Sequence, residues 1–264
     1  MESDNYFIKF IRRITFVKII IFLFLSLITI TIIFYIQLLP TIIEIKKLNN
    51  HYVKVQVDYK TGFANYSLTK NKPSSWVSIR EINLKSIKAI IISEDGFFYR
   101  HDGFDVEQIK DAVSRGIERG RWRGASTITQ QMVKNLFLNR DKNILRKIKE
   151  LILAIHADEL LKKNKIFEIY LNIIEYGPNL YGISNATRIY FNKHPSEITP
   201  REAAFIAMLL PNPKRYAESF RRKRLTMYAN KTTNRILHKM MLAHYISEEE
   251  MDVEMRRRFD WEVN

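Results

Sequence analysis

The amino-acid sequence predicts an all-α domain that follows one N-terminal transmembrane helix. Residues 19–39 form an uncharged, apolar run, and about 20 such residues cross a hydrocarbon core of ~30 Å. From residue 84 onward apolar side chains recur mostly at helical spacing, while alternating, strand-like patterns are scarce. The chain has 264 residues and 46% hydrophobic content, which suffices to bury a core of its own.

The apolar run is expected to stay in place as an anchor. No Ala or Gly precedes Gly62 and Ala64, so the small-residue cleavage site of a signal peptide is missing. Positive charge is denser before the run than directly after it, which favours a cytoplasmic N-terminus over residues 1–18 and places the rest of the chain outside the cytoplasm. The charges before it are Lys9, Arg12, Arg13 and Lys18, and those after it are Lys46 and Lys47.

The chain beyond the anchor divides into three expected parts: a linker over 40–74, a folded domain over 75–216 and a helical extension of the same domain over 217–264. Val53–Val57 alternates and predicts a short strand or an extended linker. One helix start is well marked, with Thr199 as N-cap, Pro200 at the first position and Glu202 completing a capping box. The expected helices are 84–92, 106–118, 127–137, 144–162, 165–176, 182–190, 200–210, 224–244 and 248–258.

Charge and cysteine content narrow the possible partners. The formal net charge is +15, from 43 Lys and Arg against 28 Asp and Glu, which favours nucleic acid, an acidic membrane surface or a phosphorylated substrate. A location outside the cytoplasm argues against nucleic acid. The sequence has no cysteine, so disulfides and thiolate metal sites are excluded.

The first candidate site is the acidic, glycine-punctuated segment 93–105. It gathers one histidine and four acids, a set that suits either a metal site or a solvated loop with capping aspartates. Phe97 and Phe98 offer an apolar surface that would raise the pKa of a neighbouring carboxyl group such as that of Glu94. The residues concerned are Glu94, Asp95, His101, Asp102 and Asp105.

The second candidate is the polar start of the helix at 127–137. With Ser126 as its cap, Thr127, Gln130 and Lys134 would share one face, and Ile128, Met132 and Val133 would face the core. A helix N-terminus preceded by Arg121 and Arg123 is a natural phosphate site. The alternative is an ordinary capped amphipathic helix with a solvated polar face.

The third candidate lies in the helix at 144–162. Arg146 and Glu150 are four residues apart, which is the spacing of a surface ion pair of small energetic weight. In the functional interpretation, Glu150 is instead a second carboxylate opposite Glu94, and Arg146 and Lys147 add positive potential beside it.

These segments, taken in order, resemble the four motifs of the family 51 peptidoglycan glycosyltransferases. The matching stretches are "EDGFFYRHDGFD", "GASTITQQMVKN", "RKIKE" and "IFEIYLNIIEYGPNLYGISNATRIYFNK", and "EITPREAAFIAMLLPNPKRY" resembles the segment that follows them. The resemblance runs from about Ser75 to Tyr216. A transpeptidase domain needs roughly 250 further residues, so the chain is similar to the monofunctional members of the family.

The resemblance implies a lysozyme-like helical lobe with a smaller lobe at the membrane. It implies an enzyme that joins the lipid-linked glycan strand to lipid II through a β-1,4 bond, with inversion and release of undecaprenyl pyrophosphate. Glu94 would be the general base and Glu150 the second essential carboxylate. The substrate-binding residues implied are Ser126, Thr127, Gln130, Gln131, Lys134, Asn135, Arg146 and Lys147.

The resemblance also bears on cofactors, partners and location. It implies no required cofactor, with room for Mg²⁺ or Mn²⁺ near the pyrophosphate. It implies lipid II, the lipid-linked strand, the membrane and other cell-wall synthesis proteins as partners, and no nucleic acid. The expected location is the inner membrane, crossed once, with the catalytic domain in the periplasm.

One departure from the family pattern matters for function. Relatives carry Arg or Lys seventeen residues after the base, where this chain has Asp111, and we expect the adjacent Lys110 to supply the missing charge. Two other functions remain open. A lysozyme-type lytic enzyme would also use two carboxylates across a groove, and a membrane-tethered scaffold could keep the fold without the activity.

Overall fold

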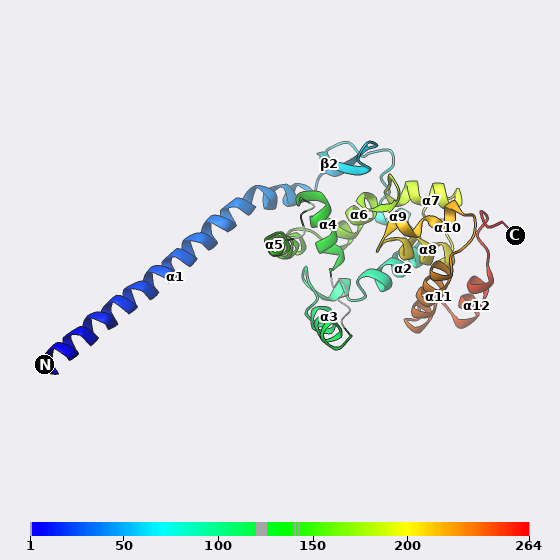
Figure 1. Ribbon diagram of the computed structural model, residues 1–264. Coiled ribbons are helices and arrows are strands. Elements are labelled where there is room, and N and C mark those ends of the chain that lie inside the picture. Colours follow the sequence, from blue (N-terminus) through cyan, green and yellow to red (C-terminus); the bar gives the residue numbers. More distant parts are fainter. Residues whose placement is uncertain (1, 120–125, 140, 142, 264) are drawn as a thin grey trace. The chain divides into compact units, whose positions relative to one another are not determined.

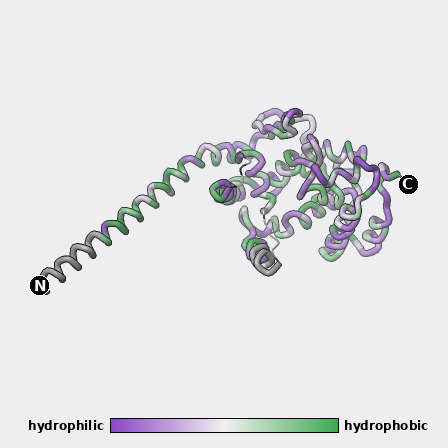
Figure 2. The backbone as a smooth tube through the Cα atoms, viewed as in Figure 1, coloured by the Kyte–Doolittle hydropathy of each residue, from purple (hydrophilic) through white to green (hydrophobic). Residues whose placement is uncertain are grey.

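The computed structural model describes residues 2–119, 126–139, 141 and 143–263. The chain forms two compact units, Met1–Ile43 and Glu44–Asn264, drawn in Figure 1. The first unit belongs to helix α1, Glu2–Lys47. Its part from Phe16 to Lys47 contains an 18-residue window with a mean hydropathy of 2.9 and is long and apolar enough to cross a membrane. Figure 2 shows the continuous hydrophobic stretch along this helix, which contains the predicted span 19–39.

The second unit opens with an antiparallel hairpin, which corrects the predicted linker 40–74. Strands β1, Tyr52–Asp58, and β2, Phe63–Thr69, pair over their whole length. The hairpin packs on the folded domain, because Tyr52 meets the Trp76 ring edge to face at 5.3 Å and the Tyr66 hydroxyl donates to the Ile173 carbonyl at 3.3 Å. The alternation at Val53–Val57 therefore marks a strand of the domain.

The rest of the unit is mainly helical, as predicted. The helices of the expected set occur within a few residues of their predicted bounds. The sequence does not predict the short helices α9 and α10, the two 3₁₀ turns or a second small hairpin. The elements are η1 Ile79–Glu81, α2 Leu84–Glu94, η2 Phe98–Arg100, α3 Val106–Arg119, α4 Ile128–Phe137, α5 Ile144–Leu160, α6 Lys163–Ile173, β3 Glu175–Gly177, β4 Leu180–Tyr181, α7 Ile183–Phe191, α8 Pro200–Leu209, α9 Pro213–Tyr216, α10 Glu218–Arg221, α11 Met227–Leu242 and α12 Glu248–Arg256.

Helix α8 is the centre of the core. All of its residues are buried, and it packs against α2, α11 and α12 (Figure 1). The predicted capping box is confirmed, since Thr199 N–H donates to Glu202 at 2.8 Å and Glu202 N–H donates to the Thr199 hydroxyl at 3.3 Å. Phe205 of α8 contacts the Phe259 and Trp261 rings at 5.0 and 5.6 Å. These contacts tie residues 217–264 into the same compact unit.

Candidate active site

The start of α4 differs from the prediction by one residue, and the difference changes which side chains face outward. Thr127 is the N-cap: its hydroxyl accepts from Gln130 N–H at 3.2 Å, and Gln130 Oε1 accepts from Thr127 N–H at 3.3 Å. The Thr127 hydroxyl also donates to the Gly103 carbonyl at 2.7 Å. Thr127 and Gln130 are buried, and their polar groups cap the helix. They therefore do not form the predicted polar face with Lys134.

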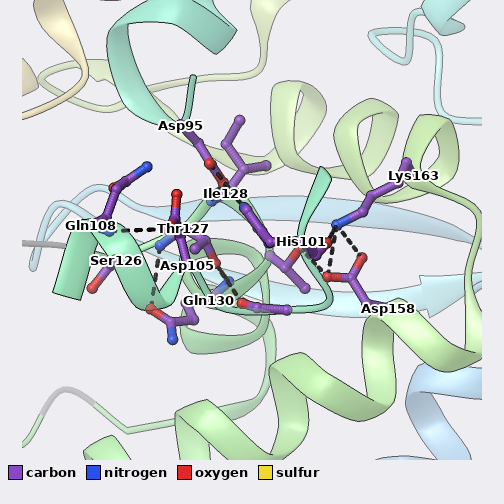
Figure 3. Close-up of polar contacts among 12 residues, drawn as sticks. Asp95, His101, Asp105, Gln108, Ser126, Thr127, Ile128, Gln130, Asp158 and Lys163 are labelled. Carbon is purple, nitrogen blue, oxygen red and sulfur yellow. Dashed lines mark hydrogen bonds and ion pairs between the residues drawn. The ribbon is translucent and has the colours of Figure 1, made fainter. Parts of the chain in front are cut away.

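The acidic loop after α2 anchors this helix end. Asp95, 1% exposed, accepts from His101 Nε2 at 2.9 Å and from Ile128 N–H at 3.0 Å (Figure 3). Asp105 accepts from Gln108 N–H at 2.9 Å and caps α3. Within the described part of the chain, no group of three His, Cys, Asp or Glu residues could hold a metal ion. Asp95 and Asp105 therefore have structural partners of their own.

A second buried carboxylate joins α4 to α5 and α6. Asp158 accepts from the Thr129 hydroxyl at 3.2 Å and from Lys163 Nζ at 2.9 Å. Lys163 Nζ also donates to the His101 carbonyl, which brings the acidic loop into the same network (Figure 3). Sequence reasoning missed Asp158 and Lys163, because their spacing carries no recognisable signal before the helices are packed.

Glu94, the last residue of α2, lies beside the outward face of α4. Gln131 Nε2 donates to Glu94 Oε2 at 3.0 Å, and the Tyr170 hydroxyl donates to Gln131 Oε1 at 3.3 Å. Burial raises the pKa of Glu94, and the charge of Asp95 raises it further, while Gln131 and Lys134 oppose the shift. The direction of the pKa shift agrees with the expectation from the sequence. Of the two phenylalanines expected to provide the apolar surface, Phe98 packs on Phe167, with ring centroids 5.7 Å apart.

Glu150 is a buried carboxylate that binds two partly exposed cations, rather than half of a surface pair. It is 1% exposed, and its carboxylate accepts from Arg146 Nη1 at 2.6 Å and from Lys147 Nζ. Lys147 Nζ also donates to the Ser126 hydroxyl at 2.8 Å. Burial chiefly lowers the pKa of Lys134, the charges of Lys147 and Arg146 lower it further, and Glu150 and Glu94 act in the opposite direction. Lys134 therefore lies in the field of both carboxylates.

These groups meet at one cleft of about 910 Å³. Helix α4 contributes Gln131, Lys134 and Asn135 to its wall, and α5 contributes Arg146. Glu94 and Glu150 are not among the lining residues, but each accepts a hydrogen bond from a residue that is, Gln131 and Arg146 respectively. Further lining comes from the end of α4 and the segment after it, the β1–β2 hairpin, α6, the β3–β4 hairpin and the segment after α8: Leu136, Leu138, Asn139, Asp58, Thr61, Phe63, Ala64, Asn65, Tyr66, Tyr170, Ile174, Glu175, Tyr181, Leu210 and Pro213.

The hairpin wall is the part of the cleft that the sequence does not predict. At its turn, the Gly62 carbonyl accepts from Lys214 Nζ at 3.4 Å and from the Tyr181 hydroxyl at 3.5 Å. Lys214 also lies 5.0 Å from the centre of the Phe63 ring. The hairpin tip is thus held against the β3–β4 hairpin and α9.

The comparisons with known proteins are in line with this geometry. A family model described as Transglycosylase matches residues 61–241. The chain belongs to the transglycosylase family. The match begins inside the hairpin, so the family domain includes strand β2 and the cleft wall that it forms.

Several transglycosylases are similar in sequence. The biosynthetic peptidoglycan transglycosylase of Brucella suis biovar 1 is 44% identical over 149 residues, which cover 56% of this chain and 66% of that protein. The protein of the same description from Aromatoleum aromaticum is 38% identical over 164 residues, covering 62% of this chain and 71% of that protein. Penicillin-binding protein 1A from Haemophilus influenzae, a solved structure, has 24% identity and a TM-score of 0.30 over 50% of this chain and 16% of that chain.

One basic residue expected at the transglycosylase site, Lys110, is not brought to the cleft by the structure. Lys110 is exposed and donates to Glu107 of its own helix at 2.8 Å, and it does not line the cleft. The Lys110 ammonium group is therefore bonded to a residue one turn earlier in α3. Arg121 and Arg123 lie outside the described residues.

Replacing Gln131 by methionine tests its hold on Glu94. Gln131 donates to the ionised carboxylate and so lowers its pKa; without that bond the pKa of Glu94 rises further. If Glu94 acts as a base, the acidic limb of the pH–rate profile should move to higher pH. The measurement is the initial rate of glycosyl transfer against pH, with Asn139→Ala as a control that removes another cleft amide. An acidic limb that does not move would mean that Gln131 does not influence the ionisation of Glu94.

Proposed function

We propose that the chain is a peptidoglycan glycosyltransferase that polymerises lipid II into β-1,4-linked glycan strands and releases undecaprenyl pyrophosphate. Family membership and the names of the relatives support this reaction. The single observation that carries it in the structure is the juxtaposition of Glu94, whose pKa is raised, with Lys134 and the cluster around Glu150 at one cleft.

In this proposal Glu94 is the general base. It takes the proton of the GlcNAc 4-hydroxyl of lipid II as that oxygen attacks the anomeric carbon of the MurNAc at the end of the lipid-linked strand. A carboxylate with a raised pKa is a stronger base than an ordinary one, and matched basicity favours proton transfer. Gln131 keeps the carboxylate oriented through its hydrogen bond.

The cations would stabilise the departing pyrophosphate. Lys134 and Arg146 line the cleft, and Lys147 is bonded to the same buried carboxylate as Arg146. Preorganised cations in a partly dry site act strongly on developing negative charge. Glu150 is then a positioning residue, which holds two of the cations in place. The expectation that no cofactor is required, with room for Mg²⁺ or Mn²⁺ near the pyrophosphate, stays a prediction.

The membrane helix fits substrates that are themselves lipids. We propose that α1 anchors the chain in the inner membrane with its N-terminus in the cytoplasm and the catalytic unit in the periplasm. The excess of Lys and Arg before the apolar run supports this orientation. Anchoring enzyme and substrates to one surface raises the rate at which they meet.

Incubation of the full-length protein with labelled lipid II, in detergent or in vesicles, tests the activity. We expect polymeric glycan to form, and we expect no clearing of preformed peptidoglycan. Clearing without polymer would identify a lytic enzyme instead. Neither polymer nor clearing from folded protein would favour the scaffold.

Replacing Lys134 by alanine should weaken binding of a phosphoglycolipid inhibitor such as moenomycin by about tenfold or more, since a hydrogen bond to a charged group contributes roughly 1.5–3 kcal/mol. Inhibitor affinity is measured directly, with Lys162→Ala as a control because Lys162 is exposed and lies outside the cleft wall. Equal affinity for the wild type and the Lys134 variant would mean that this cation does not meet the phosphate group.

A further inference from the structure

A second pocket lies where α8, the start of α11 and the end of α12 meet. Its volume is about 310 Å³, and five arginines line it beside a single acid, Glu262. It shares no lining residue with the catalytic cleft. We propose that this pocket binds an oxyanion of the phosphate class at a site separate from the cleft. The arginines are Arg201, Arg224, Arg256, Arg257 and Arg258.

The strongest indication is the buried guanidinium of Arg201, which is 4% exposed. Among the described residues its acceptors are neutral oxygens: the Asn234 side chain at 3.1 Å, the carbonyls of Glu254 and Met255 at 3.1 and 3.2 Å, and the Asn230 side chain at 3.5 Å. Its Nε is buried and has no hydrogen-bond partner in the described part of the chain. The charges of Glu254 and Glu262 act on Arg201, but in the described part of the chain neither carboxylate accepts a hydrogen bond from its guanidinium. A buried cation is costly unless it is fully paired, so this one is suited to an anion that arrives from outside.

The start of α11 adds a second, independent attraction. This helix of 16 residues begins at Met227, which lines the pocket, and its cap Thr226 accepts from Ala229 N–H at 3.2 Å. The first amides of a helix have no partner within the helix, and its dipole favours an anion at this end. The N-terminus of α11 therefore adjoins the space that the arginines surround.

Basic residues near the end of a helix have a simpler explanation, which covers only part of this cluster. Arg256 lies in the last turn of α12, where a cation offsets the helix dipole. Arg257 pairs with Glu254, with Nε and Oε1 3.0 Å apart. Arg201 and Arg224, however, come from other segments of the chain. The dipole of α12 therefore does not explain why these two arginines line the same pocket.

The chemistry favours a phosphate group. Guanidinium forks bind phosphate oxygens in pairs. At ~30 Å³ per water, the pocket holds roughly ten waters, which is more than one phosphate fills. A phosphate ester or a pyrophosphate fits this space, either as a soluble molecule or as the headgroup of an anionic lipid.

Calorimetric titration of the full-length protein with sodium pyrophosphate, at fixed ionic strength in non-ionic detergent, tests the site. All titrations use a Lys134→Ala background, so that the result does not depend on the proposed catalytic cleft. Arg224→Gln and Arg256→Gln change exposed residues, which protects the fold. We expect each to weaken binding by about tenfold and the pair by about a hundredfold, as for loss of charge-assisted bonds.

The matched control is Arg235→Gln, which removes the same charge from an exposed position on α11 outside the pocket. It should leave the affinity unchanged. Loss of affinity in the control equal to that in the pocket variants would show attraction by the net charge of +15 and overturn the proposal. So would a double variant that binds pyrophosphate as well as its parent.

Reconstitution into vesicles distinguishes a lipid headgroup from a soluble phosphate ligand. If a lipid headgroup occupies the pocket, pyrophosphate should bind more weakly in phosphatidylglycerol vesicles than in phosphatidylcholine vesicles, and the double arginine variant should lose that difference. If the natural ligand is soluble, the affinity should be the same in both. A difference that persists in the double variant would reflect surface charge and overturn the lipid assignment.

Discussion

Replacing Glu94 by glutamine should reduce the initial rate of lipid II polymerisation by about 100-fold or more, the usual contribution of a general base. The amide has the shape of the carboxylate and still offers Gln131 an acceptor, so the contact at the cleft wall is kept. It cannot accept the proton of the attacking hydroxyl. The measurement is polymer formed per minute by protein of matched folding. Full activity of the glutamine variant would contradict the assignment of the base.

The same substitution should make the folded protein more stable at neutral pH. Burial raises the pKa of Glu94 in the folded state, so the folded protein holds this proton more tightly than the unfolded chain does. Stability contributed by the group is present below the unfolded pKa and is lost as pH rises through the folded value. Urea unfolding at several pH values tests this, with exposed Glu159→Gln as the control. A gain in the free energy of unfolding that is equally large at acidic pH would exclude this explanation.

Replacing Glu150 by glutamine should lower the free energy of unfolding by roughly 1.5–3 kcal/mol, the contribution of hydrogen bonds to a charged group, because the two cations are only partly buried. Arg146 and Lys147 would lose their common anion but would still reach solvent. The rate should fall more than tenfold, because both cations leave the positions that the pyrophosphate requires.

A double-mutant cycle separates the two effects of Glu150. Adding Arg146→Gln to Glu150→Gln removes one of the two cations that have lost their common anion, so part of the lost stability should return while the activity does not. Urea unfolding and the polymerisation rate are measured on the same four proteins. An unfolding free energy equal to that of the wild type in Glu150→Gln would mean that the buried pair contributes nothing to the fold.

Local patterns were sufficient to predict most helices of the fold. The capping box at Thr199 and Glu202 needs only four consecutive residues, and the buried face of α4 follows from the spacing of Ile128, Met132 and Val133. Such features depend on interactions within one helix. The sequence therefore predicts the helical class and the approximate bounds of the main helices.

Features that depend on distant partners could not be predicted in the same way. The choice of Thr127 over Ser126 as cap involves the Gly103 carbonyl, and the hairpin turn at Gly62 is held by Tyr181 and Lys214. The environment of Glu94 combines α2, α4 and α6. None of these pairings can be recognised from residue spacing, because they arise only when the elements pack.

The bond from Ile128 N–H to Asp95 has a consequence for folding and for local opening. It joins groups 33 residues apart, and the first amide of a helix has no acceptor inside that helix. Contacts so distant along the chain form only after the loop between them closes. Protection of this single amide against hydrogen–deuterium exchange should therefore appear late in refolding. In the native protein its exchange rate should report how often the acidic loop detaches from α4.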